Sequence, residues 1–130
     1  YLHGDAPFGK IGDTSRDTFC GSVDFLISFL KETYPDAALV FLTPAHCIGD
    51  GQPSTSPFKH IEGYPLKNYV NVIEKTAAHY QVPVLNLFEK LGIDPNIKED
   101  CEKYTTDGLH FNDKGHFIIA EKLKSFLEAL

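Results

Sequence analysis

The sequence predicts an α/β fold with a parallel sheet. Apolar residues recur at helical spacing in three segments of the 130-residue chain, and two short continuous apolar runs separate those segments. An uninterrupted apolar run is typical of a strand buried on both faces, which is the usual state of a parallel strand. The resulting order of helix, strand, helix, strand and helix is that of a layered α/β protein.

The first half of the chain supplies one helix and one strand. Residues 17–34 form the first predicted helix, and Asp17 or Thr18 can cap its start. Pro35 ends this helix, because the residue before a proline avoids the helical conformation. The apolar run 38–42 follows directly and is the first predicted strand.

A long loop at residues 44–63 leads into the second helix. A loop of this length in a compact domain is usually functional, so we expect it to face a substrate, with a plain solvated loop as the alternative. Pro65 suits the first position of the second predicted helix, whose apolar stripe runs from Leu66 to Tyr80. The second predicted strand is the apolar run 82–87.

The last helix is predicted at 114–130, after a polar connection at 89–106. Asn112 or Asp113 can cap its start. His116 falls in register with the apolar stripe of this helix, so we expect a partly buried histidine. The stripe itself is expected to face the core and consists of Ile119, Ala120, Leu123, Phe126, Leu127 and Leu130.

Composition excludes several classes of protein. The chain has a net charge of −6 and 42% hydrophobic residues, which is ordinary for a globular domain. Nucleic acid is not an expected partner, because one arginine and eleven scattered lysines form no basic patch. No apolar run approaches the ~20 residues that a membrane span needs. We predict no cofactor.

The three cysteines do not indicate a metal site or a disulfide framework. Cys20, Cys47 and Cys101 lack the paired spacing that either would need. A single bridge between Cys47 and Cys101 is conceivable, whereas Cys20 lies on an apolar helical face and is expected in the core. Cysteine usage therefore fixes no cellular compartment.

The segment richest in residues that can take part in catalysis lies between the second predicted strand and the last predicted helix. Asp107 and His110 are three residues apart, and on a turn this spacing lets the carboxylate reach one imidazole nitrogen. The carboxylate then fixes the tautomer and stabilises the imidazolium, as in a Ser-His-Asp site. In the alternative, both residues only cap the last helix or are solvated. A zinc site built from Asp107, His110 and His116 is a further alternative, but no HExxH motif supports it, and we predict no metal.

A family resemblance rests on this segment and its flanks. The Asp-Gly-Leu-His run at 107–110 and the Asn-Asp-Lys-Gly-His run at 112–116 resemble the last conserved block of the SGNH hydrolases, or GDSL-type esterases and lipases. Tyr-Pro-Asp-Ala at 34–37 and Leu-Thr-Pro at 42–44 resemble the family in the same order. The family usually has Pro after the catalytic His, where this chain has Phe111.

The resemblance implies a fold and an activity. The fold is a three-layer α/β/α, flavodoxin-like (SGNH-type) arrangement with a parallel sheet, and the activity is serine-dependent hydrolysis of carboxylic esters. His110 would be the general base and Asp107 its orienting partner. Small-molecule esters are the expected substrates, because family members act on acylated sugars, lysophospholipids and simple esters.

The resemblance also implies a nucleophilic Ser and oxyanion-binding Gly and Asn residues, and none of these maps onto this chain. Gly12-Asp13-Thr14 only approximates the nucleophile block, and no Gly-x-Ser-x-Gly elbow is present. We therefore expect residues 1–130 to be one domain, the C-terminal part of such a hydrolase, with the Ser and the N-terminal strands upstream of Tyr1. On this expectation the chain alone is inactive.

Two further expectations concern binding. His46 directly follows the first strand, so we expect it to line the substrate cleft, with a solvated loop histidine as the alternative. Two buried strands need neighbours, so we expect upstream sequence or another chain to cover exposed apolar surface. A non-catalytic α/β interaction or ligand-binding module is the competing class of function.

Overall fold

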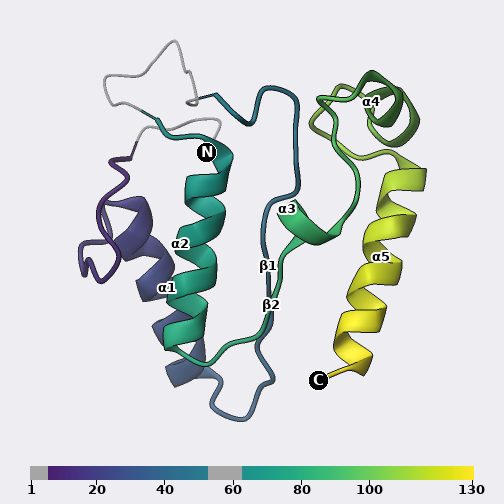
Figure 1. Ribbon diagram of the computed structural model, residues 1–130. Helices are drawn as coiled ribbons and strands as arrows, with labels where there is room; N and C mark the ends of the chain where they lie inside the picture. The colour runs from purple at the N-terminus through teal and green to yellow at the C-terminus, as the bar shows by residue number, and fades with distance from the viewer. Residues whose placement is uncertain (1–5, 53–62) are drawn as a thin grey trace. The chain divides into compact units, whose positions relative to one another are not determined.

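A computed structural model of the protein describes residues 6–52 and 63–130. The chain divides into two compact units, one made of residues 1–41 and 51–84 and the other of residues 42–50 and 85–130. The elements in chain order are α1 (Phe19–Thr33), β1 (Phe41–Leu42), α2 (Leu66–His79), β2 (Val84–Leu85), α3 (Leu87–Lys90), α4 (Lys98–Tyr104) and α5 (Asp113–Glu128) (Figure 1). This alternation of helices and strands confirms the predicted α/β class.

The first unit is built on α1 and α2, which lie side by side (Figure 1). Thr18 caps α1, because its hydroxyl accepts a hydrogen bond of 3.0 Å from the backbone N–H of Gly21. α2 begins at Leu66 with Pro65 as its N-cap, one residue after the predicted start at Pro65. The core of this unit contains the buried residues Ile27, Ala77 and Val82, with Val23, Leu39, Phe41, Tyr80 and Val84 packed against them.

The two strands pair in parallel, which confirms the predicted type of sheet. The N–H of Phe41 donates to the carbonyl of Pro83 at 2.9 Å, and the N–H of Thr43 donates to the carbonyl of Leu85 at 3.1 Å. Each strand covers two residues, so the predicted strands 38–42 and 82–87 are too long. Within the described residues each strand has only the other as a neighbour, and Leu42 is exposed rather than buried on both faces.

The second unit contains α3, α4 and α5. The predicted strand 82–87 ends early because Asn86 caps α3, accepting a hydrogen bond of 2.9 Å from the N–H of Glu89. The connection predicted at 89–106 contains α4, which packs on α5. The core of this unit is formed by Leu85, Leu87, Leu91 and Ile93, against which Ala45, Tyr104, Phe111, Ile118, Ile119, Leu123 and Phe126 pack.

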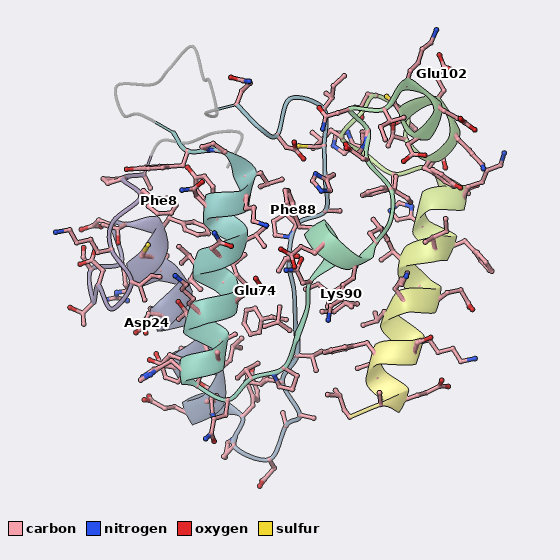
Figure 2. All side chains as sticks on the ribbon, in the orientation of Figure 1. Phe8, Asp24, Glu74, Phe88, Lys90 and Glu102 are labelled. Atoms are coloured by element: carbon pink, nitrogen blue, oxygen red, sulfur yellow. The ribbon has the colours of Figure 1, made fainter. Side chains whose placement is uncertain are left out.

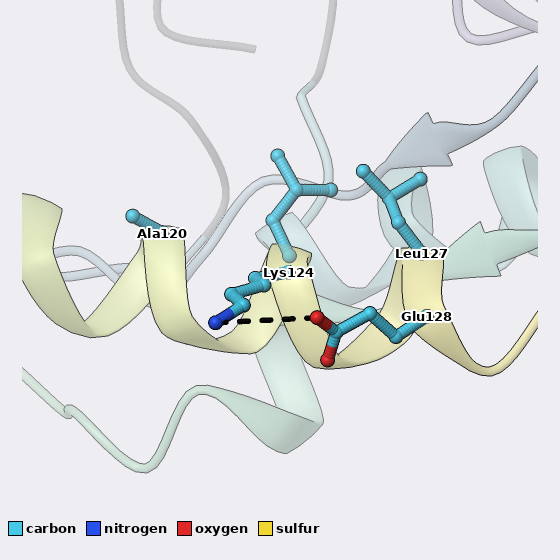
Figure 3. Close-up of a pocket in the computed structure, with 5 residues that line it drawn as sticks. Ala120, Lys124, Leu127 and Glu128 are labelled. Atoms are coloured by element: carbon cyan, nitrogen blue, oxygen red, sulfur yellow. Dashed lines mark ion pairs between the residues drawn. The ribbon is translucent and has the colours of Figure 1, made fainter.

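The apolar stripe of α5 is only partly covered, so two predictions about this helix are wrong. Ala120, Leu127 and Leu130 are exposed rather than directed into the core, and His116 is exposed rather than partly buried. Figure 3 shows Ala120 and Leu127 lining an open apolar hollow beside the ion pair of Lys124 and Glu128. The described part of the second unit does not supply enough apolar surface to cover this face.

The remaining expectations about segments have mixed outcomes. Of the long loop predicted at 44–63, residues 53–62 lie outside the described residues. Cys20 is buried in the core as predicted. The pKa of its thiol is raised, mainly because of this burial. Cys47 and Cys101 are free thiols, so the conceivable bridge between them is not formed. Among the helices of the described residues, none has the length and apolar character to cross a bilayer.

Candidate active site

Asp107 and His110 face each other across the turn between α4 and α5. The Nδ1 atom of His110 lies 2.7 Å from the Oδ2 atom of Asp107. The other carboxylate oxygen accepts the backbone N–H groups of Leu109 at 3.0 Å and His110 at 2.8 Å. The contact that the three-residue spacing predicts is therefore present, and the carboxylate fixes both the ring and the turn that carries it.

The hydrogen bonds to Asp107 keep it ionised. The pKa of its carboxyl falls from an ordinary 3.8 to about 2, first because of the backbone N–H of His110, then the His110 ring and the N–H of Leu109. An ionised carboxylate can only accept hydrogen bonds, so Nδ1 of His110 must carry the hydrogen between them. The lone pair of the neutral ring is then on Nε2.

The His110 ring is open to solvent within the described structure. Its side chain is 72% exposed, and that of Asp107 is 50% exposed. No hydrogen bond to the Nε2 atom of His110 is formed by the described residues. This nitrogen is therefore able to take a proton from a group brought next to it.

Hydrogen bonds of the Thr105 side chain hold the turn in place. The Thr105 hydroxyl donates to the carbonyl of Cys101 at 2.6 Å and accepts the N–H of Gly108 at 2.9 Å. Thr105 is 6% exposed, and its bond with the N–H of Gly108 is buried and protected from water. The N–H of Thr106 donates to the carbonyl of His110 at 2.9 Å, which closes the turn. Thr105 thus positions the Asp107–His110 segment without carrying any reacting atom.

Gly108 is required at the centre of the turn. Its φ of +83° is in the left-handed region, which favours glycine. A Cβ atom at this position would also lie 3.0 Å from the side chain of Ile48. The backbones of the same two residues are joined, because the N–H of Ile48 donates to the carbonyl of Gly108 at 2.8 Å.

The structure excludes one alternative for these residues. Asn112 caps α5, because its side-chain oxygen accepts the N–H groups of Lys114 at 3.0 Å and Gly115 at 3.2 Å. Asp107 and His110 make none of the capping bonds of this helix. Their arrangement therefore is not explained as a helix cap.

His46 belongs to a second imidazole–carboxylate pair in the same unit. Its Nδ1 atom lies 2.5 Å from Oδ2 of Asp50, and its ring packs on Phe88 with the ring centroids 3.8 Å apart. Figure 2 labels Phe88 on α3. Asn96 donates to Oδ1 of Asp50 at 3.2 Å. Asp50 and Asn96 were not among the predicted site residues. The spacing of four residues between His46 and Asp50 was an available signal, but Asn96 is too distant in sequence to be recognised.

Metal ligation has no geometric support in the described residues. They contain no group of three or more His, Cys, Asp or Glu side chains that could hold a metal ion. His116 lies on the first turn of α5, with its ring centroid 6.4 Å from that of Phe111. A zinc site of Asp107, His110 and His116 is therefore not formed in this structure.

The fold and the turn define an α/β protein with an imidazole–carboxylate pair in the turn between α4 and α5. A profile of the GDSL-like lipase/acylhydrolase family matches residues 12–123, and the chain belongs to this family.

One individual relative carries the name of the family, and two solved structures share the fold. A GDSL esterase/lipase from Arabidopsis thaliana is 24% identical over 109 residues, which are 79% of this chain and 44% of the plant protein. A crystal structure from Lactobacillus plantarum superposes with a TM-score of 0.84 and 32% identity, covering 96% of this chain and 60% of that one. A second crystal structure has the same TM-score and identity and covers 99% of this chain. The chain thus spans about half the length of the relatives that it matches.

Proposed function

We propose that the protein containing this chain hydrolyses carboxylic esters through an acyl-serine intermediate, with His110 as general base and Asp107 as its orienting partner. The observation that carries the proposal is the 2.7 Å contact between Asp107 Oδ2 and His110 Nδ1. It leaves Nε2 as the basic nitrogen, which is what proton transfer from a serine requires.

Each step uses one property of this pair. Nε2 of His110 takes the hydroxyl proton while the serine oxygen attacks the ester carbonyl. Ionised Asp107 stabilises the imidazolium that forms. The imidazolium then gives its proton to the departing alcohol, and the acyl-enzyme remains. In the second half His110 takes a proton from water while the water oxygen attacks the acyl carbon. The serine–acyl bond then breaks, the imidazolium returns its proton to the serine oxygen, and the acid is released.

The nucleophile in this proposal is a serine in sequence preceding Tyr1, together with backbone and side-chain donors that hold the oxyanion. Two observations support this arrangement. The matched part of the Lactobacillus plantarum structure is 60% of its length, so that relative contains further chain. Within the described residues, neither short strand leads into a turn that carries a serine.

The proposed substrates are small esters, such as acylated sugars, lysophospholipids or simple alkyl and aryl esters. No cofactor and no metal takes part in the proposed chemistry. The net charge of −6 gives no electrostatic attraction toward anionic lipid surfaces. We propose that sequence upstream of Tyr1 covers the exposed apolar face of α5.

The test is ester hydrolysis by the full-length protein. With a simple aryl acetate, His110→Ala should lower kcat/KM by about 10⁶-fold and Asp107→Asn by about 10⁴-fold, which are typical losses for the base and the orienting residue of a triad. His116→Ala is the matched control, because it removes an exposed histidine six residues away. Equal rates for His110→Ala and His116→Ala would contradict the proposal and favour a non-catalytic module.

A further inference from the structure

The pair formed by His46 and Asp50 resembles the Asp107–His110 pair in chemistry but differs from it in burial. The Asp50 side chain is 8% exposed, whereas the His46 ring is 28% exposed. The carboxylate lies inside the second unit, and part of the imidazole reaches its surface. An isolated buried carboxylate is costly, so the surrounding donors need to compensate it.

The donors around Asp50 supply that compensation. Its Oδ2 atom accepts the backbone N–H of Cys47 at 3.3 Å as well as the His46 ring, and its Oδ1 atom accepts the Asn96 amide. Asn96 is itself fixed, because its side-chain oxygen accepts the N–H of Gly49 at 2.9 Å. The loop that carries His46 is therefore held at several points.

This network selects one tautomer of His46. The carboxylate receives N–H groups on both oxygens, so Nδ1 of His46 is the donor of the pair. The neutral ring then has its lone pair on Nε2, for which the described residues provide no hydrogen-bond partner. Phe88 packs on one face of the ring and limits its rotation. The result is a preoriented hydrogen-bond acceptor at the surface.

The acceptor lies on a loop joined to the turn that carries Asp107 and His110. His46 follows β1, at the carboxyl end of the parallel sheet, where ligands of open α/β sheets bind. The bond from Ile48 N–H to Gly108 carbonyl fixes this loop against the turn. Ile48 and Gly108 are also in tight contact, since a Cβ on Gly108 would lie 3.0 Å from Ile48.

We propose that Nε2 of His46 accepts a hydrogen bond from a hydroxyl group of the substrate, which makes His46 a specificity-determining residue for esters of polyols. Asp50 acts through His46 and is a positioning residue. This inference rests on the proposed ester hydrolysis. It goes further by naming the class of alcohol that the site favours.

The test compares a glycerol monoester with the ethyl ester of the same acid, using the full-length protein. His46→Asn keeps a donor near the position of Nδ1 and removes Nε2, so Asp50 stays paired. The ratio of kcat/KM for glycerol ester over ethyl ester should fall about 3- to 10-fold through a higher KM, which is the size of one uncharged hydrogen bond. His46→Gln places an amide near the position of Nε2 and should restore part of the ratio.

Control measurements separate this inference from the proposed hydrolysis. His79→Asn removes an exposed histidine of the first unit and should leave the ratio unchanged. An unchanged ratio in His46→Asn would overturn the inference even if His110→Ala abolishes hydrolysis of both esters. The NMR signals of the His46 ring should shift on addition of glycerol but not of glycerol trimethyl ether, which has no hydroxyl hydrogen to donate. A ring that does not respond to glycerol overturns the inference whether or not the protein hydrolyses either ester.

Discussion

The N–H of Ile48 donates to the carbonyl of Gly108 at 2.8 Å and thereby joins the loop after β1 to the turn that carries Asp107 and His110. This bond connects segments 60 residues apart in the sequence. The position of His110 consequently depends both on its own turn and on the loop after β1 that contains Ile48.

Gly108→Ala should disturb the turn in two ways. The left-handed backbone at φ +83° becomes strained, and the new Cβ lies 3.0 Å from Ile48. We expect a loss of about 1–3 kcal/mol in the free energy of unfolding, measured in urea. Ester hydrolysis should fall at least about tenfold, because misplaced reacting groups lower the rate steeply.

Gly92→Ala is the matched control for this substitution. Gly92 has a similar φ of +77°, but a Cβ there meets no atom within 4 Å among the described residues. It should therefore show the loss of stability without the loss of hydrolysis. Equal rates for the two variants would contradict a special role for the Ile48–Gly108 contact.

Thr105→Val should weaken the support beneath the turn. Valine has nearly the same shape but leaves the buried N–H of Gly108 without the acceptor it has at 2.9 Å. The free energy of unfolding should fall by about 1–3 kcal/mol, and kcat for ester hydrolysis should also fall. Thr105→Ser keeps the hydroxyl and should retain most of the rate. A Thr105→Val protein with unchanged kcat would show that the hydroxyl does not position His110.

The carboxyl of Asp107 should titrate with a pKa of about 2, well below the ordinary 3.8. Its carbon-13 NMR signal measures this value directly. His110→Ala should raise the pKa only part of the way, because the backbone N–H groups of His110 and Leu109 still donate to Oδ1. A carboxyl that titrates near 3.8 in the unaltered protein would contradict the hydrogen bonding described here.

The same pKa fixes the sign of a pH effect on stability. Because the folded pKa lies below the unfolded one, ionised Asp107 stabilises the folded state at pH values above about 4. This contribution is lost as the pH falls through about 2. In urea unfolding between these pH values, Asp107→Asn should therefore show a weaker pH dependence than the unaltered protein.

Helices could be predicted closely because their signals are local. The Thr18 cap, Pro65 and the Asn112 cap each lie within one turn of the helix they start, and the predicted and observed starts agree within two residues. Strand lengths could not be predicted in the same way. Pairing depends on a partner more than 40 residues away, and only Phe41–Leu42 and Val84–Leu85 form strands.

In the candidate site too, contacts between residues close in sequence could be predicted and contacts between distant residues could not. The Asp107–His110 contact follows from a three-residue spacing on a turn, so the sequence is sufficient to predict it. The bond between Asn96 and Asp50 joins residues 46 positions apart, and no local pattern indicates it. His116 was placed wrongly for a related reason: its register on α5 was correct, but burial depends on what packs against that face.

Labelling of the full-length protein with a fluorophosphonate, followed by mass spectrometry, tests the central claim most directly. The reagent forms a stable bond with a serine that an adjacent histidine activates. We predict one labelled serine in sequence preceding Tyr1, with labelling at least about 10²-fold slower in His110→Ala and unchanged in His116→Ala. A labelled serine within residues 1–130 would contradict the proposed position of the nucleophile upstream of Tyr1. Labelling that proceeds equally fast in His110→Ala would contradict the assignment of His110 as general base.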